Sequence, residues 1–188
     1  MFNLSTQEVV LSIEKSPLKV VKGIIYQEYK DFFGKAWVDG FGYDCILDGK
    51  KRSFEKLEKQ TKLPRVKLKE SDRDLKKIKI FFMNLNVINA LEKKFKTKLK
   101  FDSADIWIDG AGYKLPPHTD DKRIKLSLQI YLNDNNEGTS LYDKAGNLLY
   151  TFPFAANNGY ALLNNVYSYH GVEEIEEDGR LSLYVRYR

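Results

Sequence analysis

The sequence predicts a mainly β protein with flanking helices, of the sandwich or jelly-roll type. Apolar and polar residues alternate strictly over residues 124–133 and again over 180–186, which is the pattern of half-buried strands. Turn signals separate such segments at short intervals, as in jelly rolls, a class that includes the cupins. These signals are Asp109-Gly110, Asn135-Asn136 with Gly138, Ala145-Gly146-Asn147, Asn157-Asn158-Gly159 and Asp178-Gly179.

Length and composition indicate one domain. A chain of 188 residues with 43% hydrophobic and 13% aromatic residues can bury a sizeable core, and it has no repeat, low-complexity tract or Gly/Pro/Ser-rich linker. We therefore expect a single domain over residues 1–188. Residues 1–100 would supply supporting strands, helices and a basic loop segment, and residues 105–188 would form the β core.

The N-terminal half contains the predicted helices. Residues 18–25 have the composition of a strand and 26–34 that of a short helix, while residues 71–74 (Ser-Asp-Arg-Asp) resemble an N-cap with an acidic first turn. Apolar residues then recur every three or four positions, which predicts one long amphipathic helix to about Lys96, packed on the outer face of the sheet. Its apolar stripe consists of Leu75, Ile78, Phe82, Leu85, Ile88, Leu91 and Phe95.

The two alternating segments each present a polar row. In the first, Ser127 and Gln129 stand opposite the leucines and isoleucines, and in the second Arg180 and Ser182 stand opposite Leu181 and its apolar neighbours. Such a row could form a site, or it could be the water-facing side of a surface sheet.

Charge is distributed unevenly along the chain. Residues 50–79 contain 13 Lys/Arg and 5 Asp/Glu, whereas the whole chain has a net charge of only +5. A basic patch can attract nucleic acid, an acidic peptide or an anionic small molecule, although Lys-rich loops often serve solubility alone. A role of this segment in gripping the substrate is therefore one of two open interpretations.

Compartment signals favour the cytoplasm. No apolar run approaches the roughly 18 residues that span a bilayer, and the first residues lack a signal-peptide layout. The single Cys45 cannot form an internal disulfide, as is usual in a reducing compartment. We expect a cytoplasmic protein with no membrane partner.

Both histidines of the chain fall into one metal-binding pattern. His118-Thr119-Asp120 places an imidazole and a carboxylate two residues apart, and His170 follows in the C-terminal part. Residues two apart on an extended segment point the same way, so His118 and Asp120 could reach one ion, and His170 must then come from a distant strand folded alongside. Two histidines and one carboxylate form the facial triad of non-haem Fe(II) sites, whereas an isolated H-x-D is often a pair of surface residues.

Five sequence blocks carry a resemblance to a known family. They are Pro117-His118-Thr119-Asp120, Leu128-Gln129-Ile130-Tyr131-Leu132-Asn133, Glu137-Gly138-Thr139-Ser140-Leu141, Tyr169-His170-Gly171-Val172 and Gly179-Arg180-Leu181-Ser182-Leu183. In this order and spacing they resemble the double-stranded β-helix core of the 2-oxoglutarate and Fe(II)-dependent oxygenases, most closely the prolyl-hydroxylase-like branch. The resemblance covers residues from about 105 to 188 and implies a cupin-like jelly roll.

The resemblance also implies roles for individual residues. His118, Asp120 and His170 would be the catalytic Fe(II) ligands, and Arg180 would bind the far carboxylate of 2-oxoglutarate through its planar fork. Ser182 and Tyr131 would add hydroxyl donors to that cosubstrate. Three further residues are less defined: Trp107 is either a core tryptophan or a pocket wall, Gln129 would line the pocket, and Arg186 is interpreted as structural.

The implied function is a dioxygenase that uses Fe(II), 2-oxoglutarate and O2, optionally with ascorbate, and releases succinate and CO2. It would hydroxylate a peptide or protein side chain such as proline, or a small molecule. An oxidative nucleic-acid demethylase is an alternative favoured by the basic segment and by Arg186, but the interval from His170 to Arg180 is shorter than in those proteins. A non-catalytic cupin-like binding module is the other alternative, and it leaves the complete residue set unexplained.

Overall fold

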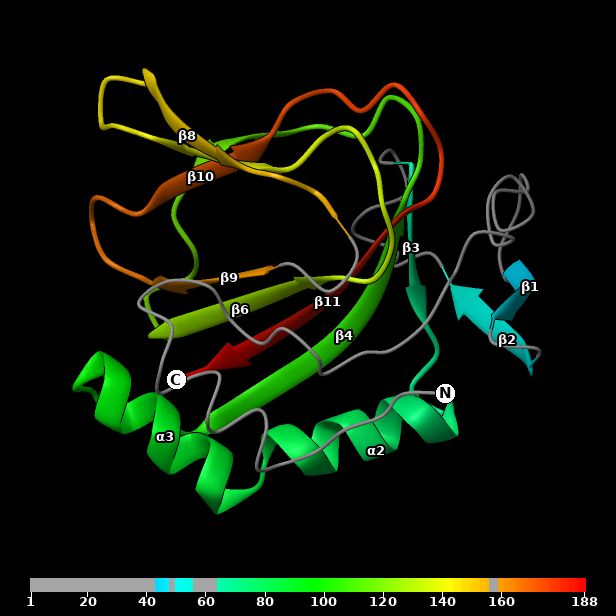
Figure 1. Cartoon of the computed structure of the whole chain (residues 1–188), viewed down its shortest axis with the longest axis horizontal. Helices are drawn as coiled ribbons and strands as arrows, with labels where there is room; N and C mark the ends of the chain where they lie inside the picture. Colours follow the sequence, from blue (N-terminus) through cyan, green and yellow to red (C-terminus); the bar gives the residue numbers. More distant parts are fainter. Residues whose placement is uncertain (1–42, 48–49, 56–63, 156–158) are drawn as a thin grey trace.

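Figure 1 shows the chain as a computed structural model, which describes residues 43–47, 50–55, 64–155 and 159–188. The strand and the helix predicted at residues 18–25 and 26–34 lie outside these ranges. Two antiparallel sheets face each other in the described part. The larger sheet has the order β1-β2-β3-β4-β11-β6-β9, and the smaller one has the order β5-β10-β7-β8. This arrangement confirms the mainly β, jelly-roll class.

The bounds of the strands are as follows. The larger sheet contains β1 (Tyr43–Leu47), β2 (Lys50–Glu55), β3 (Arg65–Leu68), β4 (Phe101–Asp109), β11 (Arg180–Tyr187), β6 (Leu126–Tyr131) and β9 (Gly159–Leu163). The smaller sheet contains β5 (Leu115–His118), β10 (Tyr169–Val172), β7 (Thr139–Tyr142) and β8 (Leu148–Phe152).

The two alternating segments became β6 and β11, which pair with each other between β4 and β9 in the larger sheet. Because successive side chains of a strand point to opposite faces, their leucines, isoleucines and valines gather on one side. There they form a continuous core with the apolar residues of β4. This core includes Leu128 of β6, Leu183 of β11 and Ile106 of β4.

Two helices cover this apolar outer face, as Figure 1 shows below the larger sheet. Helix α2 (Arg73–Phe82) begins after Asp72, whose carboxylate accepts hydrogen bonds from the amides of Asp74 and Leu75 at 2.9 and 3.1 Å. The predicted N-cap region and the packing of the helical stripe on the outer face are therefore confirmed.

The prediction of one long helix is wrong. A second helix, α3 (Leu85–Phe95), starts after Asn84, whose backbone is extended and whose side-chain oxygen accepts a hydrogen bond from the amide of Asn86 at 2.8 Å. Asparagine competes with the helical backbone for hydrogen bonds, so it caps a new helix here. The break shifts the helical phase, and Leu85, which the unbroken stripe would bury, is exposed.

The inner face of the larger sheet is polar and buried. Gln129 and Ser182 are at most 6% exposed, and Arg180 is fully buried, because the smaller sheet lies across this face. A surface sheet with one face in water is therefore excluded. Buried polar groups need partners, and the inner face supplies them around a cavity.

Candidate active site

A cavity of about 250 Å³ lies on the inner face of the larger sheet. Its walls come from strands of both sheets and from the segment that follows β5. The lining residues include the following six from the sequence prediction: Trp107, His118, Asp120, Gln129, His170 and Arg180.

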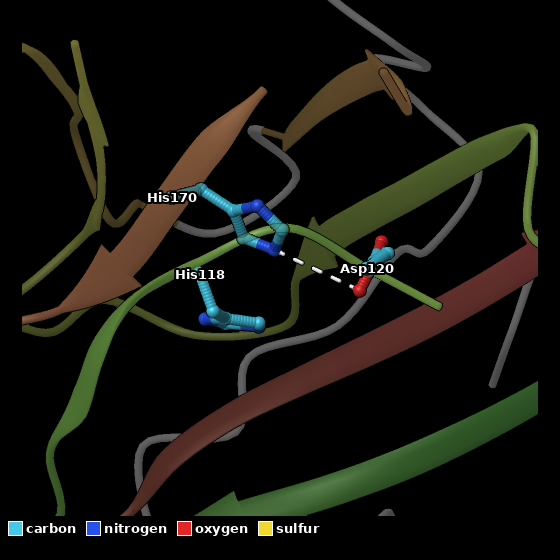
Figure 2. Close-up of side chains that lie close together, drawn as sticks. All are labelled: His118, Asp120 and His170. Atoms are coloured by element: carbon cyan, nitrogen blue, oxygen red, sulfur yellow. Dashed lines mark ion pairs between the residues drawn. The ribbon is translucent and has the colours of Figure 1, made fainter. Parts of the chain in front are cut away.

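Three residues of the cavity lining form a potential metal centre. One ligand atom each from His118, Asp120 and His170 lies within 4.8 Å of the others, which is close enough to bind one ion (Figure 2). The Nε2 atom of His170 lies 3.9 Å from Oδ1 of Asp120, and the two imidazole centroids are 4.5 Å apart. Two imidazoles and a carboxylate suit divalent first-row metals, so the donor set fits Fe(II).

Strand pairing explains how residues so far apart in sequence meet. β10 pairs with β5 in antiparallel register, and His170 lies directly opposite His118. Gly171 permits this approach, because a Cβ at that position would overlap the backbone of Leu115 and Pro116. The expectation that the second histidine comes from a strand folded alongside the first is thus confirmed.

Both histidines are oriented by the backbone. Nδ1 of His118 lies 3.0 Å from the carbonyl oxygen of Pro116, and Nδ1 of His170 lies 3.0 Å from that of Ser168. A carbonyl only accepts, so each Nδ1 carries the proton and each Nε2 keeps its lone pair for a ligand. Burial lowers the pKa of His170, which favours the neutral imidazole that metal binding requires.

Two hydroxyl groups hold the carboxylate of Asp120. The phenol of Tyr184 lies 3.0 and 2.9 Å from its two oxygens, and the hydroxyl of Ser127 donates to Oδ2 at 2.5 Å. Burial, together with the negative charge of Asp120, raises the pKa of Tyr184, so the phenol stays protonated and can donate. The Asp120 side chain therefore has a fixed orientation next to the histidines.

Two arginines that line the cavity, Arg65 and Arg180, share one buried aspartate. Arg180 Nη1 lies 2.6 Å from Oδ2 of Asp109, and Arg65 Nε lies 2.7 Å from Oδ1 of the same carboxylate. The second contact is an ion pair without hydrogen-bond alignment. Asp109 is fully buried and shared, so this arginine cluster, defined as Arg65, Asp109 and Arg180, carries one net positive charge.

Protein contacts fix the Arg180 guanidinium without using all of its N–H donors. Its Nε donates to the carbonyl of Glu137 at 2.9 Å and its Nη2 to the hydroxyl of Thr139 at 3.2 Å, in addition to the Asp109 contact. A guanidinium has five N–H donors, and Arg180 also hydrogen-bonds to the Tyr131 hydroxyl, so these four partners do not use all of its donors. Arg65 is held as well: it lies 4.3 Å from the ring centroid of Trp107 and donates to the Tyr113 hydroxyl at 2.9 Å.

A hydrogen-bond network leads from the arginine cluster across the cavity wall. The Thr139 hydroxyl donates to Gln129 Oε1 at 2.9 Å, and Tyr160 donates to the same oxygen at 2.6 Å. Gln129 Nε2 in turn donates to Ser182 at 3.2 Å. This network fixes the amide orientation of Gln129 and keeps the buried polar groups satisfied.

Two residues expected at the cosubstrate do not line the cavity. Ser182 accepts a hydrogen bond from Gln129, and Tyr131 accepts one from the amide of Thr139 at 3.1 Å while its ring stacks on Phe154. In their place, Thr139 and Tyr160 line the cavity, and their hydroxyl groups donate to Gln129. Trp107 is both buried, at 8% exposure, and part of the wall, so it combines the two interpretations of its role.

A third charged cluster lies where β3, β4 and β11 meet. Asp105 is almost fully buried and lines the cavity; Lys67 Nζ lies 2.9 Å from its Oδ1, and Arg186 Nη2 lies 3.6 Å from its Oδ2. We call Lys67, Asp105 and Arg186 the side cluster. Burial lowers the pKa of Lys67, but the hydrogen bonds to Asp105 and Glu70 outweigh this effect and raise it overall, so Lys67 is charged.

Sequence reasoning missed Arg65, Asp105 and Asp109. Arg65 lies within the basic segment, where no sequence motif distinguishes it from the other cations, and Asp109 was interpreted as part of a turn signal. Tyr184 and Arg186 carried a visible signal, because they continue the polar row of Arg180 along β11.

Comparison with solved structures establishes what the fold is like. A prolyl 4-hydroxylase from Phytophthora capsici superposes with a TM-score of 0.57 at 14% identity, over 100% of this chain and 66% of that one. AviO1 from Streptomyces viridochromogenes Tue57 superposes with a TM-score of 0.53 at 10% identity, over 100% of this chain and 96% of that one. A Pseudomonas putida prolyl-4-hydroxylase superposes with a TM-score of 0.51 at 14% identity, over 72% of this chain and 77% of that one. The chain has the prolyl-hydroxylase fold.

This likeness confirms the resemblance seen in the five sequence blocks at the level of the fold. No protein-family model matches the chain, and no curated protein matches it by sequence. Among the described residues, no helix is long and apolar enough to cross a membrane.

Proposed function

We propose that the protein is a non-haem Fe(II)- and 2-oxoglutarate-dependent dioxygenase that hydroxylates its substrate. The observation that carries this proposal is the convergence of His118, Asp120 and His170 on one point of a cavity that also contains the buried guanidinium of Arg180. When bound, Fe(II) and 2-oxoglutarate would supply the chemistry that inserts one oxygen atom of O2 into a C–H bond, with release of succinate and CO2.

The residues of the chain divide the remaining work. His118, Asp120 and His170 would hold the ion on one face and leave its other positions open. Arg180 would bind the far carboxylate of 2-oxoglutarate, with Arg65 adding positive charge. The hydroxyl groups of Thr139 and Tyr160 already donate to Gln129, so these residues hold the wall of the site in place. The burial of the arginine cluster strengthens its contact with the carboxylate, because charge-assisted hydrogen bonds gain strength away from water.

The proposed Fe(II) ligands are tested by variants of Asp120 and His170, with a variant of the neighbouring Asp121 as the control. Asp120→Asn and His170→Ala should abolish Fe(II) binding in anaerobic calorimetry. Asp121→Asn, next in sequence but exposed and paired with Arg123, should bind as the native protein does. Unchanged iron affinity in His170→Ala would show that the ligand assignment is wrong. Mn(II) or Co(II) should occupy the same site, since N/O ligands do not select iron by affinity.

Two alternatives remain distinguishable from this proposal. An oxidative nucleic-acid demethylase would draw support from the basic segment, and succinate release with methylated oligonucleotides would identify it. A non-catalytic binding module would bind metal without 2-oxoglutarate. Titration of 2-oxoglutarate into the anaerobic Fe(II) protein, followed by its absorption band, separates that module from an enzyme.

A further inference from the structure

The charges around the cavity are partly accounted for by the proposed cofactors. Asp120 together with a divalent ion has one net positive charge, which matches the carboxylate of 2-oxoglutarate that approaches the metal. The arginine cluster also has one net positive charge, because Asp109 neutralises one of Arg65 and Arg180. The second carboxylate of the cosubstrate matches it. These two positive charges and the dianion cancel.

The side cluster is left without a counter-charge. Asp105 neutralises one of its two cations, Lys67 and Arg186, so one positive charge remains. Glu70 also pairs with Lys67, and Asp121 interacts with Arg186. Glu70 pairs with Lys79 as well, and Asp121 pairs with Arg123, so including these pairs leaves the sum unchanged. Arg186 lines the cavity and is partly exposed, so this positive charge is available to an anion that enters the cavity.

Arg186 is the member of this cluster that a ligand can reach. Its side chain is 37% exposed and lines the cavity, whereas Lys67 is only 15% exposed and contacts Asp105 from the neighbouring strand. The guanidinium donates through Nε to Ser103 at 2.9 Å and lies 5.7 Å from the ring centroid of Tyr184, so it is held in place. Tyr184 contacts Asp120, which puts the side cluster beside the metal centre.

We propose that the side cluster binds the substrate through a single carboxylate, with Arg186 as the contact, and that the substrate is a small monocarboxylic acid. This inference rests on the proposed function and assigns Arg186 a binding role in place of the structural role expected from the sequence. A carboxylate matches the one unbalanced charge, whereas a phosphate monoester at about −1.5 to −2 exceeds it. The cavity of about 250 Å³ must also hold 2-oxoglutarate, and the volume that remains favours a small molecule over a bulky group.

The test measures binding and not turnover. The anaerobic protein is first loaded with Fe(II) and 2-oxoglutarate, and each loading step is followed by calorimetry. A panel of free amino acids and small hydroxy acids is then titrated, each beside its primary amide, which has nearly the same shape without the charge. At least one acid should bind saturably, and its amide should bind about tenfold or more weakly, as expected for loss of a charge-assisted contact.

Two variants that change the charge of the side cluster in opposite directions test the same contact. Arg186→Gln should weaken binding of the acid about tenfold, Asp105→Asn should strengthen it, and 2-oxoglutarate affinity should be unchanged in Arg186→Gln. Arg188→Gln is the matched control, because this arginine pairs with Asp102 and does not line the cavity.

Three outcomes would overturn the proposal while the cofactors still bind. They are absence of binding by every acid of the panel, equal binding of acids and amides, and an Arg186→Gln variant with native affinity for the acid. Tight binding of a methylated oligonucleotide that Arg186→Gln abolishes would likewise replace a small acid by nucleic acid. Failure of the Fe(II) or 2-oxoglutarate loading itself would instead overturn the proposed function.

Discussion

The two faces of the larger sheet are both buried, but they are buried in different ways. On the outer face, apolar side chains such as Leu183 and Leu128 form one core with those of α2 and α3. On the inner face, Arg180 and Asp109 are equally buried and are stabilised by an ion pair and hydrogen bonds. Adjacent residues of one strand therefore belong to two different environments.

This contrast separates stability from chemistry. Apolar burial contributes on the order of 25 cal/mol per Å² to folding, so the outer face is where stability originates. A buried ion pair repays its desolvation only with good geometry, and it is weak evidence for a stabilising role. The charged inner face is therefore better explained by ligand binding than by folding, and variants on the two faces should have separable effects.

The largest effect is expected from Leu183→Ala on the outer face. Its side chain is fully buried in the main core, and the vacated space should lower the free energy of unfolding by about 3–5 kcal/mol. Urea denaturation measures this loss. The folded fraction should keep native affinity for Fe(II) and 2-oxoglutarate, because Leu183 points away from the cavity. Loss of cosubstrate affinity without loss of stability would contradict the separation of the two faces.

A smaller effect, of the opposite kind, is expected from Arg180 on the inner face. Arg180→Ala should weaken 2-oxoglutarate binding by about 2–3 kcal/mol, which is roughly 30-fold or more. Arg180→Lys should also bind poorly, because an ammonium cannot reproduce the planar fork. Titration of the anaerobic Fe(II) protein measures both, with iron affinity nearly unchanged.

Arg65 makes the Arg180 prediction sharper. Arg65→Gln removes one charge from the same cluster but leaves the Arg180 fork intact, so its loss should be smaller than that of Arg180→Ala. If Arg65→Gln lost more affinity than Arg180→Ala, then Arg65 and not Arg180 would be the main anchor. Native affinity in both variants would place the anchor outside the arginine cluster.

The sequence reveals the two faces more clearly than it reveals the partners on them. Alternation along 124–133 and 180–186 was enough to predict β6 and β11, and the H-x-D spacing was enough to predict that His118 and Asp120 meet an opposing histidine. These features are local, because they depend on residues two apart on one extended segment. The cap at Asn84 is also local, but the apolar periodicity on both sides of it concealed the break.

Partners that come from different strands left no such signal. Asp109 stands opposite both Arg65 and Arg180 only because β4 lies between β3 and β11 in the sheet. Neither alternation nor turn chemistry specifies that order of strands. Likewise, Thr139 reaches Gln129 and Arg180 from the facing sheet, and its role depends on how the two sheets are stacked.

The smallest expected effect concerns Tyr184, which supports a proposed metal ligand without binding the metal itself. Its phenol donates to the Asp120 carboxylate, so Tyr184→Phe removes the donor and keeps the ring that packs near Arg186. Outer partners of metal ligands are typically worth about 10- to 100-fold in affinity, and Ser127 still donates to Asp120, so we expect about tenfold weaker Fe(II) binding. Ser127→Ala should weaken Fe(II) binding by a similar amount, and the double variant should weaken it more than either, because Asp120 would then lose both donors.

Stability should change little compared with Leu183→Ala, and 2-oxoglutarate affinity at saturating iron should be native. Unaltered iron affinity in the double variant would mean that Asp120 is held by its backbone alone, or that it is not a ligand.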